Sequence, residues 1–181
     1  MANFEQLSFL VVNRNTNMTR ILRNVLRGLG TEDVYEASNN TEAKSAVEAA
    51  TMLDFILLDP VMEGRKTGYD FVKWLRQDPK SPNPHIPIIA ISAAASKDDV
   101  LEAVKNGVDE FISIPMAPIE LIRRVSKIIY KPHAYIRAPG YFGPCRRRHE
   151  DAHYSGEERR STTPKEVDGN TVLPPAHGNA A

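Results

Sequence analysis

The run Phe55-Ile-Leu-Leu-Asp59 constrains the fold of this 181-residue chain more than any other stretch. Four consecutive apolar residues are too few for a helix and indicate a strand covered on both faces, as parallel strands are in an α/β sheet. The carboxyl ends of such strands face the crevice in which ligands and chemistry collect. The sequence therefore predicts that Asp59 lies at a functional edge of a central strand.

The rest of the first 131 residues alternates between short apolar runs and segments of helical periodicity. Ser96 and Asp99 have the spacing of a capping box, Gly107 is typical of a helix end, and Thr41 is the expected N-cap of an earlier helix. The expected strands are residues 7–12, 33–37, 55–59, 88–91 and 111–114, and the expected helices are residues 16–29, 41–50, 68–76, 96–106 and 119–130. This alternation over short loops predicts a doubly wound, five-stranded parallel sheet in the α/β class.

The composition excludes several classes of protein. The chain is formally neutral, with 23 basic and 23 acidic residues, and its single cysteine, Cys145, excludes an intramolecular disulfide framework. No apolar stretch approaches the roughly 20 residues of a membrane span, and the amino terminus lacks the pattern of a signal peptide. We therefore expect a cytoplasmic protein.

The order of the elements resembles the receiver domain of bacterial response regulators, which has the CheY-like, flavodoxin-like fold. The resemblance implies that Asp59 occupies the phosphoacceptor position, Ser92 the position of the hydroxyl that senses the phosphoryl group, and Phe111 the position of the switch aromatic. It also implies a cis peptide bond between Ile114 and Pro115. The motifs that carry it are Phe9-Leu-Val-Val12, Phe55-Ile-Leu-Leu-Asp59, Ala90-Ile-Ser-Ala93, Asn106-Gly107 and Ile114-Pro115.

The chain departs from the family at the residues that hold magnesium and phosphate. Asn13 and Arg14 stand where receivers have an acidic pair, and Ile114 stands where they have a lysine. Two unit charges about 4 Å apart interact by about 4 kcal/mol at an effective dielectric constant of 20, so Arg14 would repel a divalent ion. We therefore expect a degenerate receiver that binds no magnesium, with Arg14 lying against Asp59. An internal ion pair of Asp59 is favoured over its phosphorylation, which remains the alternative.

Nothing in the sequence indicates an enzyme, because it contains no glycine-rich phosphate loop and no nucleophile with a paired base. Cys145, His149 and His153 are each four residues apart and would share one face of a helix, a spacing that can bind zinc. The segment is flanked by glycine and proline and no fourth ligand is forced. A chance spacing is therefore favoured over a metal site.

A repeat follows the predicted receiver domain. Tyr141-x-Gly-x-x-Arg-Arg147 and Tyr154-x-Gly-x-x-Arg-Arg160 share one spacing, thirteen residues apart. Each unit offers an aromatic ring, a glycine turn and two guanidinium groups that can stack on bases and bind phosphates. The predicted division of the chain is a receiver domain at residues 1–131, a linker and arginine-rich ligand-binding segment at residues 132–160, and a disordered tail at residues 161–181.

Two equivalent units suit a ligand with two equivalent halves, such as a cyclic dinucleotide. A CheY-like domain followed by Tyr-x-Gly-Pro-x-Arg-Arg resembles the Cle group of receivers, which bind cyclic di-GMP through an arginine-rich tail and act at the flagellar motor. Cys145 replaces the usual aspartate, which leaves Glu150, Asp151, Glu157 and Glu158 as candidates to bind the guanine edge. The expected cyclic di-GMP ligands are Arg137, Tyr141, Arg146, Arg147, Arg148, Tyr154, Arg159 and Arg160.

The favoured function is a non-enzymatic signalling adaptor that binds cyclic di-GMP and docks on the flagellar motor switch or another signalling protein. One alternative is a phosphorylation-controlled single-domain response regulator, and another is a nucleic-acid-binding or structural interaction protein. Residues 137–160 hold six arginines against four acidic residues, which is a weak charge for duplex binding and disfavours a nucleic-acid partner. We expect this segment to be disordered alone and to become ordered around cyclic di-GMP.

The resemblance also implies a docking surface on the fourth helix, the fifth strand and the fifth helix. Its expected apolar contacts are Val100, Val104, Phe111 and Ile119, and its expected charged positions are Lys97, Glu102 and Lys105. For Val104 and Ile119, core packing is an equally good interpretation.

Overall fold

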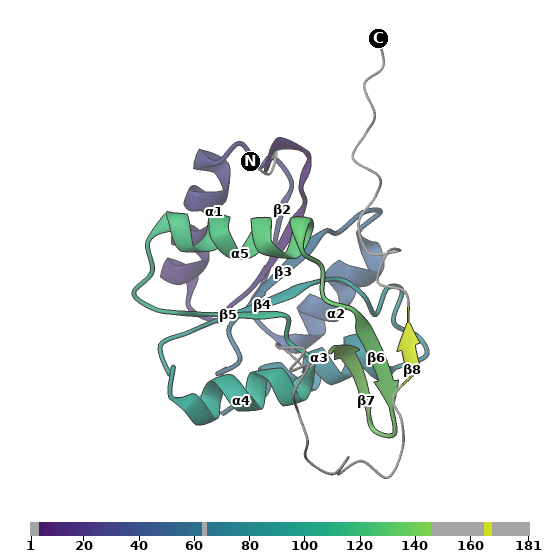
Figure 1. Cartoon of the computed structure of the whole chain (residues 1–181). Coiled ribbons are helices and arrows are strands. Elements are labelled where there is room, and N and C mark those ends of the chain that lie inside the picture. Colours follow the sequence, from purple (N-terminus) through teal and green to yellow (C-terminus); the bar gives the residue numbers. More distant parts are fainter. Residues whose placement is uncertain (1–3, 63–64, 146–164, 168–181) are drawn as a thin grey trace.

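A five-stranded parallel sheet forms the centre of the computed structural model, which describes residues 4–62, 65–145 and 165–167 (Figure 1). The strand order is β2-β1-β3-β4-β5, so β1 and β3 are neighbours and the predicted doubly wound sheet is confirmed. In such a sheet the crevice at the carboxyl edge lies where the strand order reverses. The strands are β1 (Phe9–Val12), β2 (Val34–Ala37), β3 (Phe55–Leu58), β4 (Ile88–Ser92) and β5 (Glu110–Ser113).

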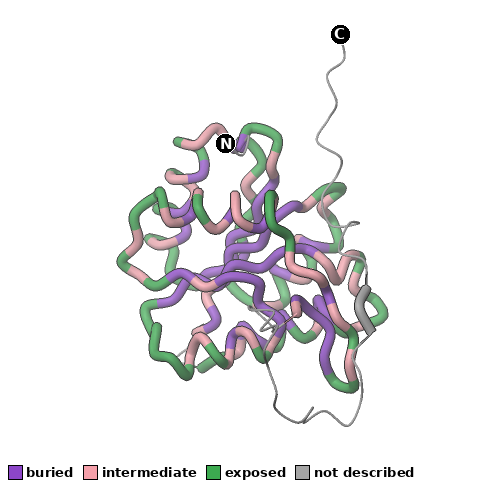
Figure 2. Tube along the Cα trace, in the orientation of Figure 1, coloured by how far each residue is buried: buried purple, intermediate pink, exposed green. Residues whose placement is uncertain are grey.

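Two layers of helices cover the sheet (Figure 1). α1 (Thr16–Gly28) and α5 (Pro118–Tyr130) pack on one face, while α2 (Asn40–Ala49), α3 (Gly68–Gln77) and α4 (Lys97–Asn106) pack on the other. Successive side chains of a strand point to opposite faces, so Leu10 and Val12 belong to one core while Phe9 and Val11 belong to the other. Burial on both faces explains the continuous apolar runs of the central strands (Figure 2).

The helix ends follow the sequence signals with one exception. The capping box of Ser96 and Asp99 is present, and Gly107 ends α4 with φ +97°. Thr41 is not the N-cap of α2, because Asn39 takes that role and its side chain accepts a hydrogen bond from the Glu42 backbone N–H at 2.9 Å. Every helix among the described residues is too short or too polar to cross a membrane.

A small antiparallel sheet follows α5, where the sequence predicted a linker. β6 (Tyr135–Ala138) and β7 (Tyr141–Pro144) form a hairpin, and β8 (Lys165–Val167) pairs with the other edge of β6. The Tyr135 and Phe142 side chains are 3% and 1% exposed, so the hairpin is packed rather than extended in solvent. Residues 137–144 and 165–167 are therefore more ordered than predicted. The physical reason is that Pro139-Gly140 makes a two-residue turn, with Gly140 at φ +70°, instead of interrupting regular structure.

Candidate functional site at the carboxyl edge of the sheet

Asp59 lies at the predicted edge of the sheet, directly after β3. Val12 of β1 pairs with Leu58, and the Asp59 backbone N–H donates to the Val12 carbonyl oxygen at 2.9 Å. Leu58 also pairs with Ala90 of β4, which places Ser92 at the end of the neighbouring strand. The sheet therefore brings the ends of β1, β3 and β4, with Asn13, Asp59 and Ser92, to one edge.

Gly68 allows α3 to begin against the Asp59 backbone. A Cβ atom at Gly68 would lie 2.8 Å from the Asp59 carbonyl oxygen and 2.8 Å from the Pro60 Cα atom, closer than side-chain atoms approach backbone. The Gly68 N–H donates to the Pro60 carbonyl oxygen at 3.1 Å. Only glycine fits this close approach, and no pattern in the sequence around Gly68 indicates it.

Asn13 directly follows β1, and its side chain faces Asp59. Its Oδ1 atom accepts a hydrogen bond from the Asn15 backbone N–H at 2.8 Å, which fixes the orientation of the amide. The amino group, Nδ2, therefore points toward Asp59 and lies 3.4 Å from the Asp59 Oδ2 atom. Asn13 presents a hydrogen-bond donor to the carboxylate, where a metal site requires an oxygen ligand.

The Asp59 carboxylate is half-buried, and its second described partner is the Val61 backbone N–H, which donates to Oδ1 at 2.9 Å. Burial raises the pKa of Asp59, and the hydrogen bond from Val61 only partly opposes this effect. The destabilisation of the ionised carboxylate by burial is therefore larger than its stabilisation by the hydrogen bond from Val61.

The described partners of the Asp59 carboxylate differ from those expected. Among the described residues, the hydrogen-bond donors to the Asp59 carboxylate are Asn13 and Val61, where Arg14 was expected. The reason is that Asn13 is buried beside the carboxylate whereas Arg14, the next residue, is exposed. The receiver resemblance implies a magnesium ion at this edge, but the Asn13 amino group that faces Asp59 is a hydrogen-bond donor and not a metal ligand. No group of three or more His, Cys, Asp and Glu side chains among the described residues could hold a metal ion.

Ser92 is the last residue of β4, and Phe111 lies in the neighbouring strand β5. Ser92 is buried, and its Oγ atom accepts a hydrogen bond from the Ala94 backbone N–H at 3.2 Å at the start of the loop to α4. Phe111 of β5 is half-buried and packs against the layer of α2, α3 and α4. The predicted cis peptide bond between Ile114 and Pro115 is confirmed.

Comparison with known proteins decides the family, since residues 9–126 match the family model of the response regulator receiver domain. The chain belongs to the receiver domain family. It is 34% identical over 123 residues to chemotaxis protein CheY1 of Helicobacter pylori, which covers 68% of this chain and 97% of that protein. It is 30% identical over 122 residues to chemotaxis protein CheY of Pseudomonas aeruginosa, which covers 67% of this chain and 95% of that protein.

Solved structures agree with this assignment. A putative response regulator from Chloroflexus aurantiacus superposes with a TM-score of 0.61 at 26% identity, covering 69% of this chain and 98% of that one. Chemotaxis protein CheY4 of Vibrio cholerae superposes with a TM-score of 0.59 at 22% identity, covering 67% of this chain and 98% of that one, and supports the fold alone. The hairpin lies beyond residues 9–126, which the family model matches.

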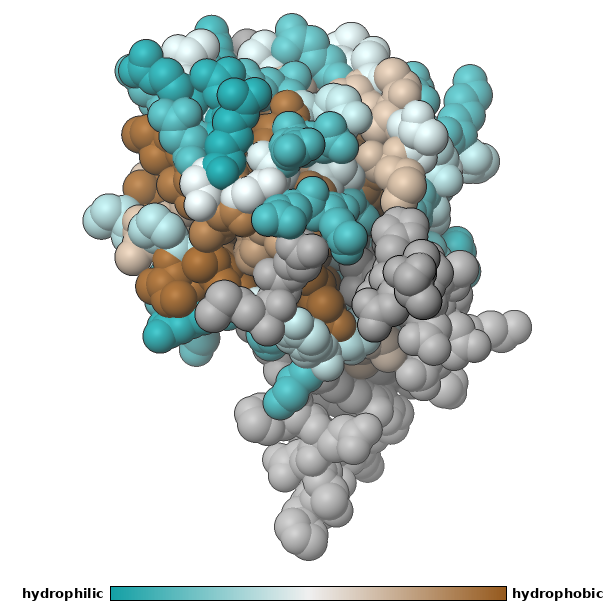
Figure 3. Space-filling model, turned by 90° about the horizontal axis from the view of Figure 1, so that it is seen from above, coloured by the Kyte–Doolittle hydropathy of each residue, from teal (hydrophilic) through white to brown (hydrophobic). Residues whose placement is uncertain are grey.

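The receiver domain has a groove of about 370 Å³ between α4, β5 and α5. Val100 and Phe111 line it, together with Met116, whereas Val104 and Ile119 are not among its lining residues. Ile119 is 47% exposed, so core packing does not explain it. Figure 3 shows that apolar side chains gather mainly at one side of the face seen from above, while hydrophilic side chains cover most of the rest.

The charged positions expected on this surface are not equivalent. Lys97 is exposed at the start of α4. Glu102 instead pairs with Lys66 of the loop after β3, which also pairs with Asp99 at 2.9 Å. A change at Glu102 would therefore disturb an internal contact between α4 and the Asp59 loop as well as the surface.

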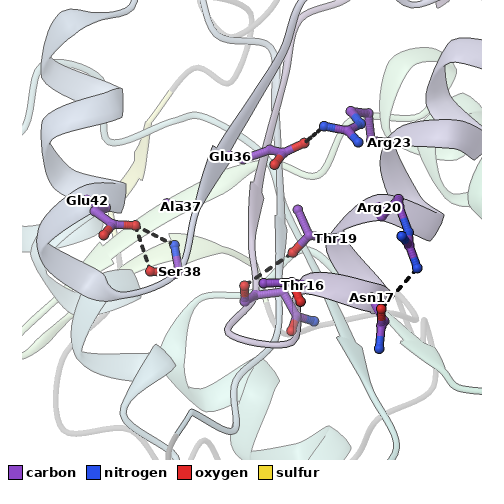
Figure 4. Close-up of a pocket in the computed structure, with 10 residues that line it drawn as sticks. Thr16, Asn17, Thr19, Arg20, Arg23, Glu36, Ala37, Ser38 and Glu42 are labelled. Carbon is purple, nitrogen blue, oxygen red and sulfur yellow. Dashed lines mark hydrogen bonds and ion pairs between the residues drawn. The ribbon is translucent and has the colours of Figure 1, made fainter.

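A second hollow of about 400 Å³ lies between α1, β2 and α2 (Figure 4). Its charged groups are largely occupied by each other, because Arg23 pairs with Glu36 at 2.9 Å and Glu42 accepts hydrogen bonds from Ser38. Arg20 donates to the Asn17 side chain at 3.1 Å. The described charged groups Arg23, Glu36 and Glu42 of this hollow are therefore already engaged within the protein.

Two of the eight expected cyclic di-GMP ligands lie in the described residues. The Arg137 guanidinium carbon lies 4.4 Å from the centre of the Phe142 ring, and Arg137 is exposed. Tyr141 is instead buried, and its hydroxyl donates to the Pro144 carbonyl oxygen at 2.8 Å, so its ring is not available to a base in this arrangement. The other expected ligands lie outside the described residues: Arg146, Arg147, Arg148, Tyr154, Arg159 and Arg160. His149 and His153, which belong to the possible zinc-binding spacing, also lie outside the described residues.

Proposed function

We propose that this chain is a non-enzymatic signalling adaptor in the cytoplasm. In this proposal the extension binds cyclic di-GMP through its arginines, and the groove between α4, β5 and α5 docks a protein partner, the flagellar motor switch. The matched relatives named above are chemotaxis proteins, which supports a signalling role. The observation that carries the ligand proposal is the stack of Arg137 on Phe142, from which the chain continues into the arginine run at Arg146.

The Arg137 side chain is prepared for a planar ligand. Stacking on Phe142 holds the guanidinium flat, and the exposure of the residue lets a purine ring stack on it. A lysine ammonium lacks the planar surface that this contact uses. Arg137 therefore favours a nucleobase over a simple anion.

The ends of the arginine-bearing segment are held close together. The chain leaves the small sheet after β7 and returns to it at β8, and these two strands flank β6 on opposite edges. Holding both ends reduces the chain entropy that remains to be lost when the segment orders. Charge-assisted hydrogen bonds contribute about 1.5 to 3 kcal/mol each, while ordering a segment costs about 2 to 5 kcal/mol. Several arginine contacts then suffice for micromolar binding, about 8 kcal/mol.

The Asp59 edge supports control by a ligand in place of a metal-dependent phosphorylation. Asn13 offers an amino group where an oxygen ligand is needed, and burial raises the pKa of Asp59. We propose that no magnesium binds here.

Calorimetry with cyclic di-GMP, GTP and a single-stranded oligonucleotide tests the ligand. We expect cyclic di-GMP to bind most tightly, and we expect Arg137→Lys and the pair Arg146→Lys and Arg147→Lys to weaken it almost as much as alanine does. Lys131→Ala, which removes an exposed positive charge just before β6, is the matched control. Equal binding of all three ligands, or lysine variants that bind like the wild type, would favour a purely electrostatic tail.

Binding to a flagellar switch protein tests the groove. Lys97→Glu should weaken that binding by about tenfold, since charges at a rim steer association, whereas Lys73→Glu on α3 should have no effect. Equal binding by both variants would place the docking surface elsewhere.

Phosphorylation of Asp59 is the second candidate, and one observation favours it: Asp59 and Ser92 end neighbouring strands in a chain of the receiver family. NMR with beryllofluoride and magnesium separates the two functions. We expect no magnesium-dependent change, and shifts that cluster at Asp59, Ser92 and Phe111 would support phosphorylation instead.

A further inference from the structure

A buried ion pair joins α3 to the loop between α4 and β5. The Arg76 side chain is fully buried, and its Nη2 atom donates to the Asp109 Oδ2 atom at 2.9 Å. Its Nε atom donates to the Gly107 carbonyl oxygen at 3.1 Å, and Nη1 donates to the carbonyl oxygens of Pro84 and Ile86 at 2.6 and 2.8 Å. The guanidinium thus fixes the loop from Gly107 to Asp109 by several directed contacts.

The hairpin supplies a further hydrogen-bond donor to the carboxylate of this ion pair. The Tyr135 hydroxyl of β6 donates to the Asp109 Oδ1 atom at 2.8 Å, while Oδ2 accepts from Arg76 and from the Ile88 backbone N–H. The Tyr135 ring also lies 5.3 Å from the Arg76 guanidinium carbon. Because Asp109 is buried, Oδ1 would lack a protein donor without Tyr135, and an unsatisfied buried oxygen is unfavourable.

The second strand of the hairpin rests on the same loop. A Cβ atom at Gly143 would lie 3.0 Å from the Gly107 Cα atom, and a Cβ atom at Gly107 would lie 3.2 Å from the Phe142 carbonyl oxygen. The two backbones therefore touch at a pair of glycines. Backbone lies against backbone at this point, so a displacement of β7 would bear directly on the α4–β5 loop.

This loop connects the two elements that line the docking groove. It follows α4, which contributes Val100, and precedes β5, which contributes Phe111 two residues after Asp109. We infer that the hairpin is a clamp on the α4–β5 loop and couples the state of the C-terminal extension to the shape of the groove, with Tyr135 as the positioning residue. The identities of the ligand and the partner rest on the proposed function, but the clamp does not.

Coupling of this kind is reciprocal. A ligand that binds better when the hairpin is docked stabilises one arrangement of the groove, and a groove partner that prefers this arrangement raises the affinity for the ligand by the same factor. The clamp thus gives a route from the extension to the docking surface that bypasses Asp59.

Backbone NMR of the full chain without ligand tests the clamp. Tyr135→Phe removes the hydroxyl but keeps the ring, and Tyr130→Phe, at an exposed position of α5, is the matched control. We expect Tyr135→Phe to shift the amide signals of Val100 and Met116 in the groove, and Tyr130→Phe to leave them unchanged. Shifts confined to the hairpin and Asp109 would overturn the clamp. Gly143→Ala, whose added Cβ atom would lie 3.0 Å from both the Gly107 Cα atom and the Tyr141 hydroxyl oxygen, provides a second perturbation of the contact with the same two readings.

Addition of cyclic di-GMP tests the transmission. Tyr135→Phe should bind it with a dissociation constant within about threefold of the wild type, yet the wild type alone should show ligand-induced shifts at Val100 and Met116. Equal shifts in both proteins would overturn the inference. If the wild type binds no cyclic di-GMP, the proposed function fails while the ligand-free comparison still decides the clamp.

Discussion

Asp59 directly follows the central strand β3 and Asp109 directly precedes the edge strand β5, and the two carboxylates have different hydrogen-bond partners. Asp59 is half-buried, with a long contact of 3.4 Å from Asn13 and a backbone donor at Val61. Asp109 is buried and binds Arg76, Tyr135 and the Ile88 backbone N–H at 2.8 to 2.9 Å. Asp59, at the phosphoacceptor-like position, is thus weakly constrained by hydrogen bonds, whereas Asp109, which contacts the hairpin, is strongly constrained. The carboxylate that contacts the hairpin therefore has more and shorter hydrogen bonds than the carboxylate at the phosphoacceptor-like position.

The largest expected effect is at Asp109. Asp109→Ala leaves the buried Arg76 without its anion, and breaking a buried pair in this way costs about 3 to 5 kcal/mol of unfolding free energy. Asp59→Ala, the matched variant at the other carboxylate, should cost far less. Urea denaturation measures both free energies, and equal losses would remove the contrast between the two sites.

The next effect concerns Glu110, which follows Asp109 and is the first residue of β5. Burial raises the pKa of Glu110, but hydrogen bonds from His133 and Lys127, together with the charges of Lys127 and Arg124, outweigh it and lower the pKa to about 2. A depressed carboxyl pKa stabilises the protein fully above the unfolded pKa, 4.5, and this stability is lost as the pH falls toward 2.

Glu110→Gln should therefore lower the unfolding free energy by about 2 kcal/mol at pH 7. The difference from the wild type should shrink below pH 4.5 and nearly vanish at pH 2. Denaturation at a series of pH values measures this, with Glu48→Gln on the exposed side of α2 as the control. A difference that is independent of pH would contradict the assigned ion pairs.

A smaller effect of opposite sign is expected at Asp59. Because burial raises its pKa above 3.8 in the folded state, the ionised carboxylate costs stability as the pH rises past that value. Asp59→Asn should raise the melting temperature by about 1 to 2 °C at pH 7, and the gain should disappear at pH 3. A loss of stability at pH 7 would show that the charge of Asp59 has a favourable partner.

The smallest effect is the recovery of a metal site. Replacing Asn13 and Arg14 by aspartates removes the amino group beside Asp59 and supplies oxygen ligands. We expect weak magnesium binding, with a dissociation constant of about 1 mM, seen as shifts of the Asp59 and Ser92 amide signals. Calcium titration is the control for a general charge effect. A wild-type protein that binds magnesium as well as this variant would contradict the amide orientation of Asn13.

The sheet and the position of Asp59 were predictable because they depend on local patterns. Apolar runs of strand length and a capping box at Ser96 report burial and helix ends within a few residues of sequence. The cis bond before Pro115 followed from the family resemblance. Asn13 was identified as a departure, yet the direction of its amide depends on the Asn15 backbone N–H and could not be read from the sequence.

The hairpin was missed because its signals are short. Pro139-Gly140 interrupts the sequence pattern in the same way whether it forms a turn or a linker, and the two strands beside it have only four residues each. The contacts that decide between these possibilities join Tyr135 to Asp109, 26 residues away, and Gly143 to Gly107. No periodicity within either segment records them. The expected arginine ligands from Arg146 onward stay predictions.

The contact between Gly107 and Gly143 determines whether the extension can be moved to another protein. A receiver with any side chain at the position of Gly107 would place a Cβ atom 3.2 Å from the Phe142 carbonyl oxygen and lose the left-handed backbone that ends α4. It would also need a carboxylate at the position of Asp109 to accept from Tyr135. A chimaera that carries the hairpin, residues 135–144, therefore requires a host whose α4–β5 loop has both features.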